Sequence, residues 1–332
     1  MMGRLVRVKA GHRARLATPP PRLIAHRTSA APNEPPMLAA SETDAPGATA
    51  PPTSPPRATP RRRVVTPETA IGPVAVARDF VDGFALNRVW LAFAWDDVQN
   101  RYRRSVLGIA WIGLSYLFFV FAILVLFRGY TLGSSDAFLH YVAIGYASFV
   151  FLSGHLGDGC EVFRSNKAWV KAAPLPRSIY VYKNVARALF PFAIQLALAL
   201  GVMTATGWRP GPVTAMTVPA LLAWLLTALP IQMLLGHLAA RLQDVRHLVQ
   251  TVQRMLFFLS PVLWVLSERD GLARTLALLN PVTHYMEVFR APLLGEPVLA
   301  ISWVVVMLTT AASWILCLLI VGRMRAKLPF WL

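Results

Sequence analysis

The sequence RYRRSVLG (residues 101–108) leads directly into an uncharged run, IAWIGLSYLFFVFAILVLF (residues 109–127). As an α-helix this run would be about 28 Å long, at ~1.5 Å per residue, which matches the hydrocarbon thickness of a bilayer. Arginines are favoured among the headgroups on the cytoplasmic side of a membrane. The stretch therefore predicts the point at which the chain enters the membrane from its cytoplasmic face.

The composition also indicates a membrane protein. The 332 residues are 55% hydrophobic and 15% charged, with a mean hydropathy of +0.49. Cys160 and Cys317 are far apart and form no CxxC motif, which predicts neither a disulfide framework nor a metal site. The sequence contains no GxxxxGK[ST], HExxH or GxSxG motif. We therefore expect no catalytic residues and no cofactor bound by this chain.

The net charge of +17 does not predict nucleic-acid binding, because of where the charge lies. Residues 1–67 hold eleven Lys/Arg, three acids and thirteen of the 26 prolines, without a sustained apolar period. That composition cannot bury a core, and it predicts a disordered basic arm. The arm lacks the apolar centre of a secretory signal, so we expect it in the cytoplasm. A start codon assigned upstream of the real one is the alternative.

Residues 68–332 are predicted to form an all-α membrane domain with six transmembrane helices. The predicted spans are residues 109–127, 137–157, 188–206, 213–235, 248–266 and 298–321. The fifth has an uncharged stretch of only twelve residues, 255–266, and must include the preceding helical turns. Few ionisable groups interrupt the spans, so proton or sodium coupling is not expected. We interpret His155 as a helix-end histidine, and Gln195 and Gln232 as bonds between helices.

The distribution of Lys and Arg predicts the topology. With an inside N-terminus, seventeen of the cations beyond the arm fall on the inside and five on the outside. This bias predicts a multi-pass protein with both termini in the cytoplasm, and the resemblance described below implies the bacterial inner membrane.

Three segments outside the spans carry further predictions. Residues 79–100 place Phe80, Trp95 and other apolar residues on one helical face with most acids turned away, which predicts an amphipathic helix in the inner interface or, alternatively, a small soluble cap. The basic loop 158–187 predicts a rigid projection suited to another protein, or positive-inside charge alone. Residues 267–297 contain two short apolar stretches separated by Asn-Pro, which predict a re-entrant hairpin between spans five and six, or one resting on the outer interface.

Aromatic residues are frequent in the first two spans. Trp111, Tyr116 and Tyr146 are among them. Lipid contact is the default for such residues, but stacked rings also provide a surface for the apolar faces of sugars. Both interpretations stay open.

Four phrases, preceded by the amphipathic helix, then occur in order: RYRRSVLGIAWIGLS, EVFRSNKAWVKAAPLPRSIYVYKNVARALF, LQDVRHLVQTVQRMLFFLSPVLW and LNPVTHYMEVFRAPLLGEP. Together they resemble the membrane half of type-2 ABC exporters of lipid-linked polysaccharide, the permeases of O-antigen, capsule and teichoic-acid export. The resemblance covers roughly residues 78–330. The arm is not part of the family pattern, and we assign it no role.

The resemblance implies partners and site residues. It implies a homodimer that works with a separate ABC ATPase, which holds the ATP and Mg²⁺, on a polyprenyl-diphosphate-linked glycan. It further implies a lipid-diphosphate entrance at Arg101, Arg103 and Arg104, where guanidinium groups can pair with phosphate oxygens. The remaining implied sites are ATPase coupling at Lys167, Lys171, Arg177, Tyr180, Arg241 and Asp244, and an outer gate at Asn280, Pro281, Tyr285 and Arg290. From the aromatic residues themselves we predict that Trp111, Tyr116 and Tyr146 line the channel.

Two other functions remain possible from the sequence. One is a type-2 ABC permease that exports a drug or a free lipid. The other is a membrane scaffold or lipid-modifying enzyme. The sequence does not specify which glycan is moved, whether export follows or accompanies polymerisation, or whether the ATPase has a sugar-binding domain.

Overall fold

The computed structural model describes residues 71–103, 105–127, 135–268 and 270–332, which contain helices and no strand, so the predicted all-α class is confirmed. The predicted arm lies outside these residues. In chain order the helices are α1 (Pro73–Ala85), α2 (Asn87–Tyr102), α3 (Ala110–Phe127), α4 (Ser135–Glu161), α5 (Lys167–Ala172), α6 (Ser178–Ala205), η1 (Pro212–Met216), α7 (Thr217–Arg241), α8 (Asp244–Leu259), η2 (Leu266–Glu268), α9 (Leu272–Leu279), α10 (Pro281–Leu294), α11 (Ala300–Met324), η3 (Arg325–Lys327) and α12 (Leu328–Trp331).

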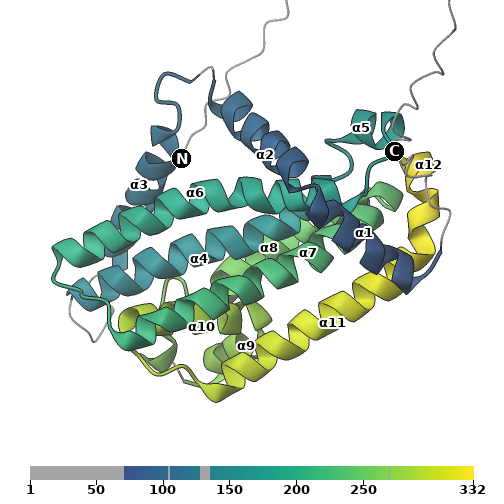
Figure 1. Ribbon diagram of the computed structural model, residues 1–332. Coiled ribbons are helices and arrows are strands. Elements are labelled where there is room, and N and C mark those ends of the chain that lie inside the picture. Colours follow the sequence, from purple (N-terminus) through teal and green to yellow (C-terminus); the bar gives the residue numbers. More distant parts are fainter. Residues whose placement is uncertain (1–70, 104, 128–134, 269) are drawn as a thin grey trace, which may run out of the picture. The chain divides into compact units, whose positions relative to one another are not determined.

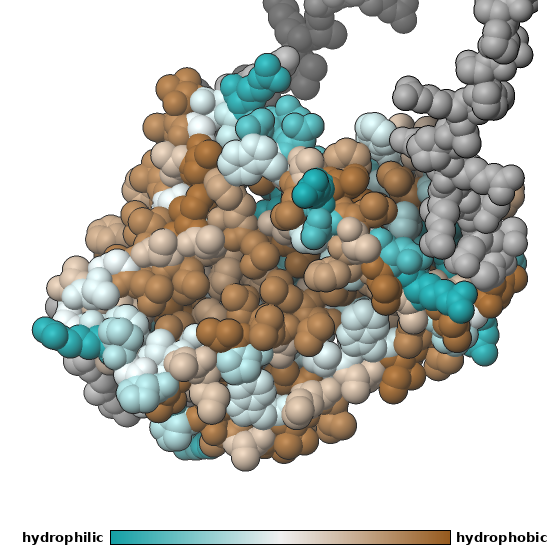
Figure 2. All heavy atoms as spheres, in the orientation of Figure 1, coloured by the Kyte–Doolittle hydropathy of each residue, from teal (hydrophilic) through white to brown (hydrophobic). Residues whose placement is uncertain are grey.

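Four helical segments in the described part of the chain are long and apolar enough to cross a membrane. They are α4, α6, α7 with η1, and α11 with the short helices after it. Figure 1 shows α4, α6 and α7 running alongside one another, with α11 next to α7. On the face drawn in Figure 2, apolar residues form a broad band over the long helices, and hydrophilic residues gather at its borders. α3 is also apolar, but it is shorter. The helices fit a multi-pass membrane protein.

The prediction of a helix over residues 248–266 is wrong, because α8 ends at Leu259. Ser260 adopts an extended conformation, φ −89° and ψ 145°, as expected for a residue before a proline. α8 has sixteen residues and is about 24 Å long, at ~1.5 Å per residue, which is short of a full crossing. The count of six spans therefore stays a prediction.

The single helix predicted over residues 79–100 is two helices, α1 and α2, joined at Leu86. α1 packs against both α11 and the start of α6, whereas α2 packs against α6. Gly83 permits this arrangement, since a Cβ at that position would overlap the side chain of Ser178 at the start of α6. Asp79, one of the acids of this segment, has a buried side chain.

The third predicted span begins ten residues earlier than expected. α6 starts at Ser178 and continues to Ala205, so its length of about 42 Å, at ~1.5 Å per residue, exceeds the hydrocarbon thickness. Its first turns are buried and share a core with α1, α7 and α11 that includes Phe80 and Tyr180. A second core surrounds α4 and includes Phe151, Trp224 and Phe289. The basic loop before α6 is therefore fixed to the body of the protein at its C-terminal end.

The predicted pair of short helices after α8 is present as α9 and α10. Asn280 ends α9 and caps α10, because its side chain accepts a hydrogen bond from the Val282 amide at 3.0 Å. Pro281 occupies the first turn of α10, where its missing N–H is not needed. α10 is largely buried against α4, α7 and α11, whereas most residues of α9 are exposed.

Candidate functional site

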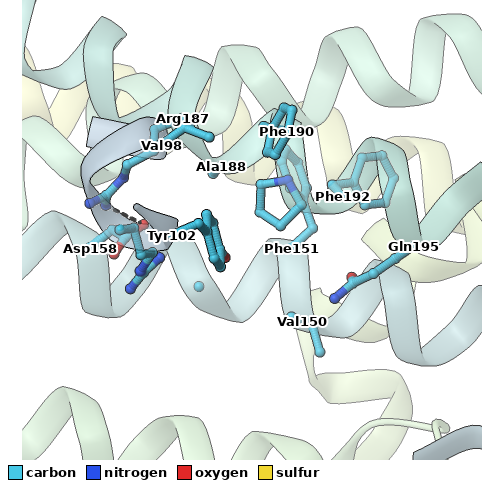
Figure 3. A pocket seen from close by; sticks show the side chains of 13 residues that line it. Val98, Tyr102, Val150, Phe151, Asp158, Arg187, Ala188, Phe190, Phe192 and Gln195 are labelled. Atoms are coloured by element: carbon cyan, nitrogen blue, oxygen red, sulfur yellow. Dashed lines mark ion pairs between the residues drawn. The ribbon is translucent and has the colours of Figure 1, made fainter. Parts of the chain in front are cut away.

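A cavity of about 150 Å³ lies where α2 meets α4 and α6. One end is charged: Figure 3 shows Arg187 paired with Asp158 there, and Phe192 and Gln195 toward the other end. The walls combine cations with rings, and they are formed by Val98, Arg101, Tyr102, Val150, Phe151, Gly154, Asp158, Arg187, Ala188, Phe190, Pro191, Phe192 and Gln195. A site with a basic end and an apolar end matches an amphiphile that has an anionic headgroup.

Ion pairs hold the helices around this cavity. Arg187 Nη2 lies 3.0 Å from Asp158 Oδ2, which joins α6 to α4. Lys183 Nζ lies 2.8 Å from Asp97 Oδ2 and donates to Asn166 Oδ1 at 2.8 Å, which joins α6 to α2 and to the residue before α5. Lys183 is buried, so its charge depends on these two partners.

The predicted entrance arginines occupy different positions. Arg101 lines the cavity, is exposed, and forms no ion pair with another described residue. Arg103 is exposed at the end of α2 and does not line the cavity. Arg104 lies outside the described residues. The sequence analysis missed Arg187 as a cavity residue, although its spacing from Lys183 indicated one helical face.

α5 presents the predicted coupling lysines to solvent. Lys167 and Lys171 are both exposed, as is Trp169 between them, whose ring lies 5.4 Å from that of Phe93 on α2. Asn166 anchors the base of the helix, since it is buried and donates to the Val162 carbonyl at 2.7 Å. α5 is thus a short basic projection on a fixed base.

Arg177 belongs to a group of charges that we call the charged junction: the buried Asp79 on α1, the half-buried Arg177 before α6 and the buried Arg325 after α11. The Asp79 carboxylate accepts from the Arg177 amide at 3.2 Å and from the Ser178 amide at 2.8 Å, and it pairs with Arg325 at 3.3 Å. The Arg177 guanidinium donates to the Arg325 carbonyl. Burial, and then the charge of Arg325, lower the pKa of Arg177 to about 10. One carboxylate therefore joins three segments.

The other predicted coupling residues differ in accessibility. Tyr180 is 1% exposed, so its side chain cannot contact another protein directly in this structure. Arg241 is exposed at the end of α7, and its guanidinium lies 5.9 Å from the ring centre of Trp331. Asp244 is exposed in the first turn of α8. A coupling role for these residues stays a prediction.

The three predicted channel aromatics do not form one surface. Tyr116 is 2% exposed, and its hydroxyl donates to the Ala143 carbonyl at 2.9 Å. Tyr146 is half-buried and stacks on Phe119, with ring centres 3.7 Å apart. Trp111 is exposed near the start of α3. Tyr116 is therefore a core residue in this conformation, and a channel role for Trp111 and Tyr146 stays a prediction.

The residues predicted as an outer gate are internal supports of the hairpin. The Tyr285 hydroxyl lies at the centre of a hydroxyl cluster with Thr227 on α7 at 2.8 Å, and with Thr309 at 2.9 Å and Thr310 at 2.8 Å on α11. Arg290 is 1% exposed. It donates to the Pro261 carbonyl at 2.8 Å and to Glu287 at 3.0 Å, and it lies over the Tyr141 ring at 3.6 Å. These contacts connect α10 with α7, α11 and the segment after α8.

Comparison with known proteins defines the class. A family profile described as ABC-2 type transporter matches residues 88–294. The match covers more than half of the chain, from α2 to the end of α10. The chain therefore belongs to the ABC-2 type transporter family and is a multi-pass membrane subunit of a transporter, which works with an ABC ATPase. The resemblance seen in the sequence is confirmed.

One relative has a more specific name than the family. The chain is 27% identical over 225 residues to a protein of Myxococcus xanthus named O-antigen export system permease protein RfbA. The match covers 65% of this chain and 86% of the relative.

Proposed function

We propose that this chain is the membrane-spanning permease subunit of an ATP-driven exporter of a polyprenyl-diphosphate-linked glycan. The observation that carries the proposal is the similarity to a protein named as an O-antigen export permease, over 86% of that protein's length. The cavity between α2, α4 and α6 adds a chemical reason. Arg101, which forms no ion pair with another described residue, can pair with phosphate oxygens, and Phe151 and Phe192 provide an apolar wall beside it.

The proposal includes a topology and an assembly. The basic end with α5 faces the cytoplasm of a bacterial inner membrane, in accordance with the excess of cations there. α3 and α8, with the segment after α8, complete six crossings, and α9 and α10 form a re-entrant outer gate whose backbone ends are covered by neighbouring helices. Two copies form the channel, and separate ATPase subunits bind ATP with Mg²⁺ and contact α5.

Deletion of the gene in its host provides the direct test. We expect lipid-linked polymer to accumulate inside the cell and surface polysaccharide to be lost. Analysis of the retained lipid separates this function from drug or free-lipid export, because only a glycan exporter leaves a sugar-bearing polyprenyl lipid behind. Normal surface polysaccharide in the deletion strain would contradict the proposal.

A combined variant tests the entrance. Arg101→Gln, Arg103→Gln and Arg104→Gln together should reduce export, because phosphate loses its two-point partners, while the permease still co-purifies with its ATPase. Arg78→Gln with Arg88→Gln is the control, since both arginines are exposed on α1 and α2 outside the cavity. Full export by the triple variant would limit the three arginines to orienting the chain in the membrane.

A further inference from the structure

A second cavity, of about 340 Å³, lies among α4, α7, α8, α10 and α11. Pockets of about 300–1,000 Å³ are the usual size for small-molecule sites. It shares no lining residue with the cavity at α2. Its walls are mostly aliphatic and aromatic, and they are formed by Leu152, His155, Leu156, Trp224, Thr227, Ala228, Ile231, Val252, Leu256, Asn280, Pro281, Val282, Tyr285 and Thr309.

The polar groups in this wall are satisfied within the protein, with one exception. Tyr285 and Thr227 bond each other, and the Asn280 amide donates to Ser260 at 2.9 Å. His155 is 3% exposed and lines the cavity, but its Nε2 atom has no hydrogen-bond partner. Buried polar atoms are nearly always paired, so an unpaired ring nitrogen on a residue that lines an apolar cavity indicates a site for a ligand atom.

The second nitrogen of His155 defines what that ligand atom can be. His155 Nδ1 lies 2.7 Å from the Gln232 side-chain nitrogen, and Gln232 is fully buried. With the amide assigned as donor, Nδ1 accepts and the ring proton is on Nε2. Nε2 can then donate to an oxygen. The cavity thus offers a long apolar wall and one hydrogen-bond donor.

We propose that this cavity binds a single apolar chain of a membrane amphiphile, with an oxygen near its attachment point at His155. Mostly apolar walls exclude a free sugar or nucleotide, whose hydroxyl groups would lose their hydrogen bonds. Access is available from the side of α8, where Val252 lines the cavity and is 39% exposed. The chain can come from a phospholipid or from an isoprenoid substrate, and the second source rests on the proposed function.

Photo-crosslinking of the full-length protein, purified with any ATPase that accompanies it and placed in nanodiscs, tests the proposal. Two probes distinguish the sources: a phosphatidylethanolamine with a diazirine in its acyl chain, and a polyprenyl phosphate with a diazirine in its isoprenoid chain. Peptides from α4 and α7 that contain Leu156 and Ile231 are then examined by mass spectrometry. We expect one or both probes to label these peptides, and the labelling probe identifies the source.

Two variants on α8 provide the matched comparison. Val252→Trp places an indole in the rim of the cavity, and it should reduce labelling roughly tenfold, equivalent to ~1.4 kcal/mol of binding free energy. Leu259→Trp is the control, because Leu259 is also 39% exposed on α8 but does not line the cavity. Val252→Phe replaces the first variant if that protein aggregates. Absence of labelling by both probes, or equal labelling of the rim and control variants, would overturn the proposal. Neither result would contradict the proposed export function, which the deletion strain tests separately.

Discussion

The charged junction and the hydroxyl cluster both connect α11 to the rest of the protein, but they do so by opposite means. At the junction, Arg325 directly after α11 pairs with the buried carboxylate of Asp79, which also accepts two backbone amides. At the cluster, Thr309 and Thr310 within α11 bond the neutral hydroxyl of Tyr285. One region depends on buried charge and the other on neutral hydrogen bonds.

The difference follows from the chemistry of the surroundings. A buried charge that loses its partner costs about 3–5 kcal/mol, because the remaining charge is left without solvation. A hydrogen bond between helices within a membrane is worth ~0.6–2 kcal/mol, because its partners find others when it is broken. Arg177 of the charged junction follows α5 in the chain, so the segment that carries the exposed lysines ends at the more strongly fixed region. Removing one side-chain group should therefore lower the free energy of unfolding far more at the charged junction than at the hydroxyl cluster.

The largest effect is expected at the charged junction. Asp79→Ala removes the partner of Arg325 and two amide acceptors, and it should lower the free energy of unfolding by about 3–5 kcal/mol. Thermal unfolding of the detergent-solubilised protein measures the change. Asp82→Ala is the matched control, because Asp82 is exposed on the same helix. Equal unfolding temperatures for the two variants would show that the junction does not stabilise the protein.

Asp79 also shows where prediction from sequence reaches its limit. An acid in an amphipathic helix is normally assigned to the solvent-facing side, yet the partners of Asp79 lie 98 and 246 residues away in the chain. No local pattern connects them. The same limit applies to Tyr116 and Tyr146, since an apolar run does not show which rings face lipid and which face another helix.

Local signals predicted other features well. The uncharged runs marked α3, α4, α7 and α11, because length and hydropathy alone decide whether a helix is apolar. Asn280 and Pro281 correctly predicted the break between α9 and α10. Pro261 is the signal that could have predicted the end of α8, because the residue before a proline is disfavoured in a helix. Of the cavity between α2, α4 and α6, only Arg101 was assigned in advance, because the other walls come from three separate helices.

A smaller effect is expected at the hydroxyl cluster. Tyr285→Phe removes the hydroxyl that joins α10 to α7 and α11, and it should lower the unfolding free energy by about 1–2 kcal/mol, since its partners are neutral hydroxyls and the Val306 carbonyl. The same thermal measurement applies. Tyr146→Phe serves as the control, because the Tyr146 hydroxyl forms no hydrogen bond with another described residue. A loss as large as that of Asp79→Ala would remove the distinction between the two regions.

The smallest effect on stability is expected on α5. Lys167→Gln with Lys171→Gln changes two exposed cations that form no ion pair with another described residue, so unfolding should shift by less than about 0.5 kcal/mol. Export should nevertheless decrease, because α5 is the exposed basic projection above the fixed junction and is the proposed ATPase contact. Surface polysaccharide and ATPase co-purification are the readouts. Arg323→Gln with Lys327→Gln is the control, because it removes the same charge from two other exposed positions, one in the last turn of α11 and one just after it. If both double variants lower export equally, the net charge of this end of the protein is responsible, and α5 has no specific part in coupling.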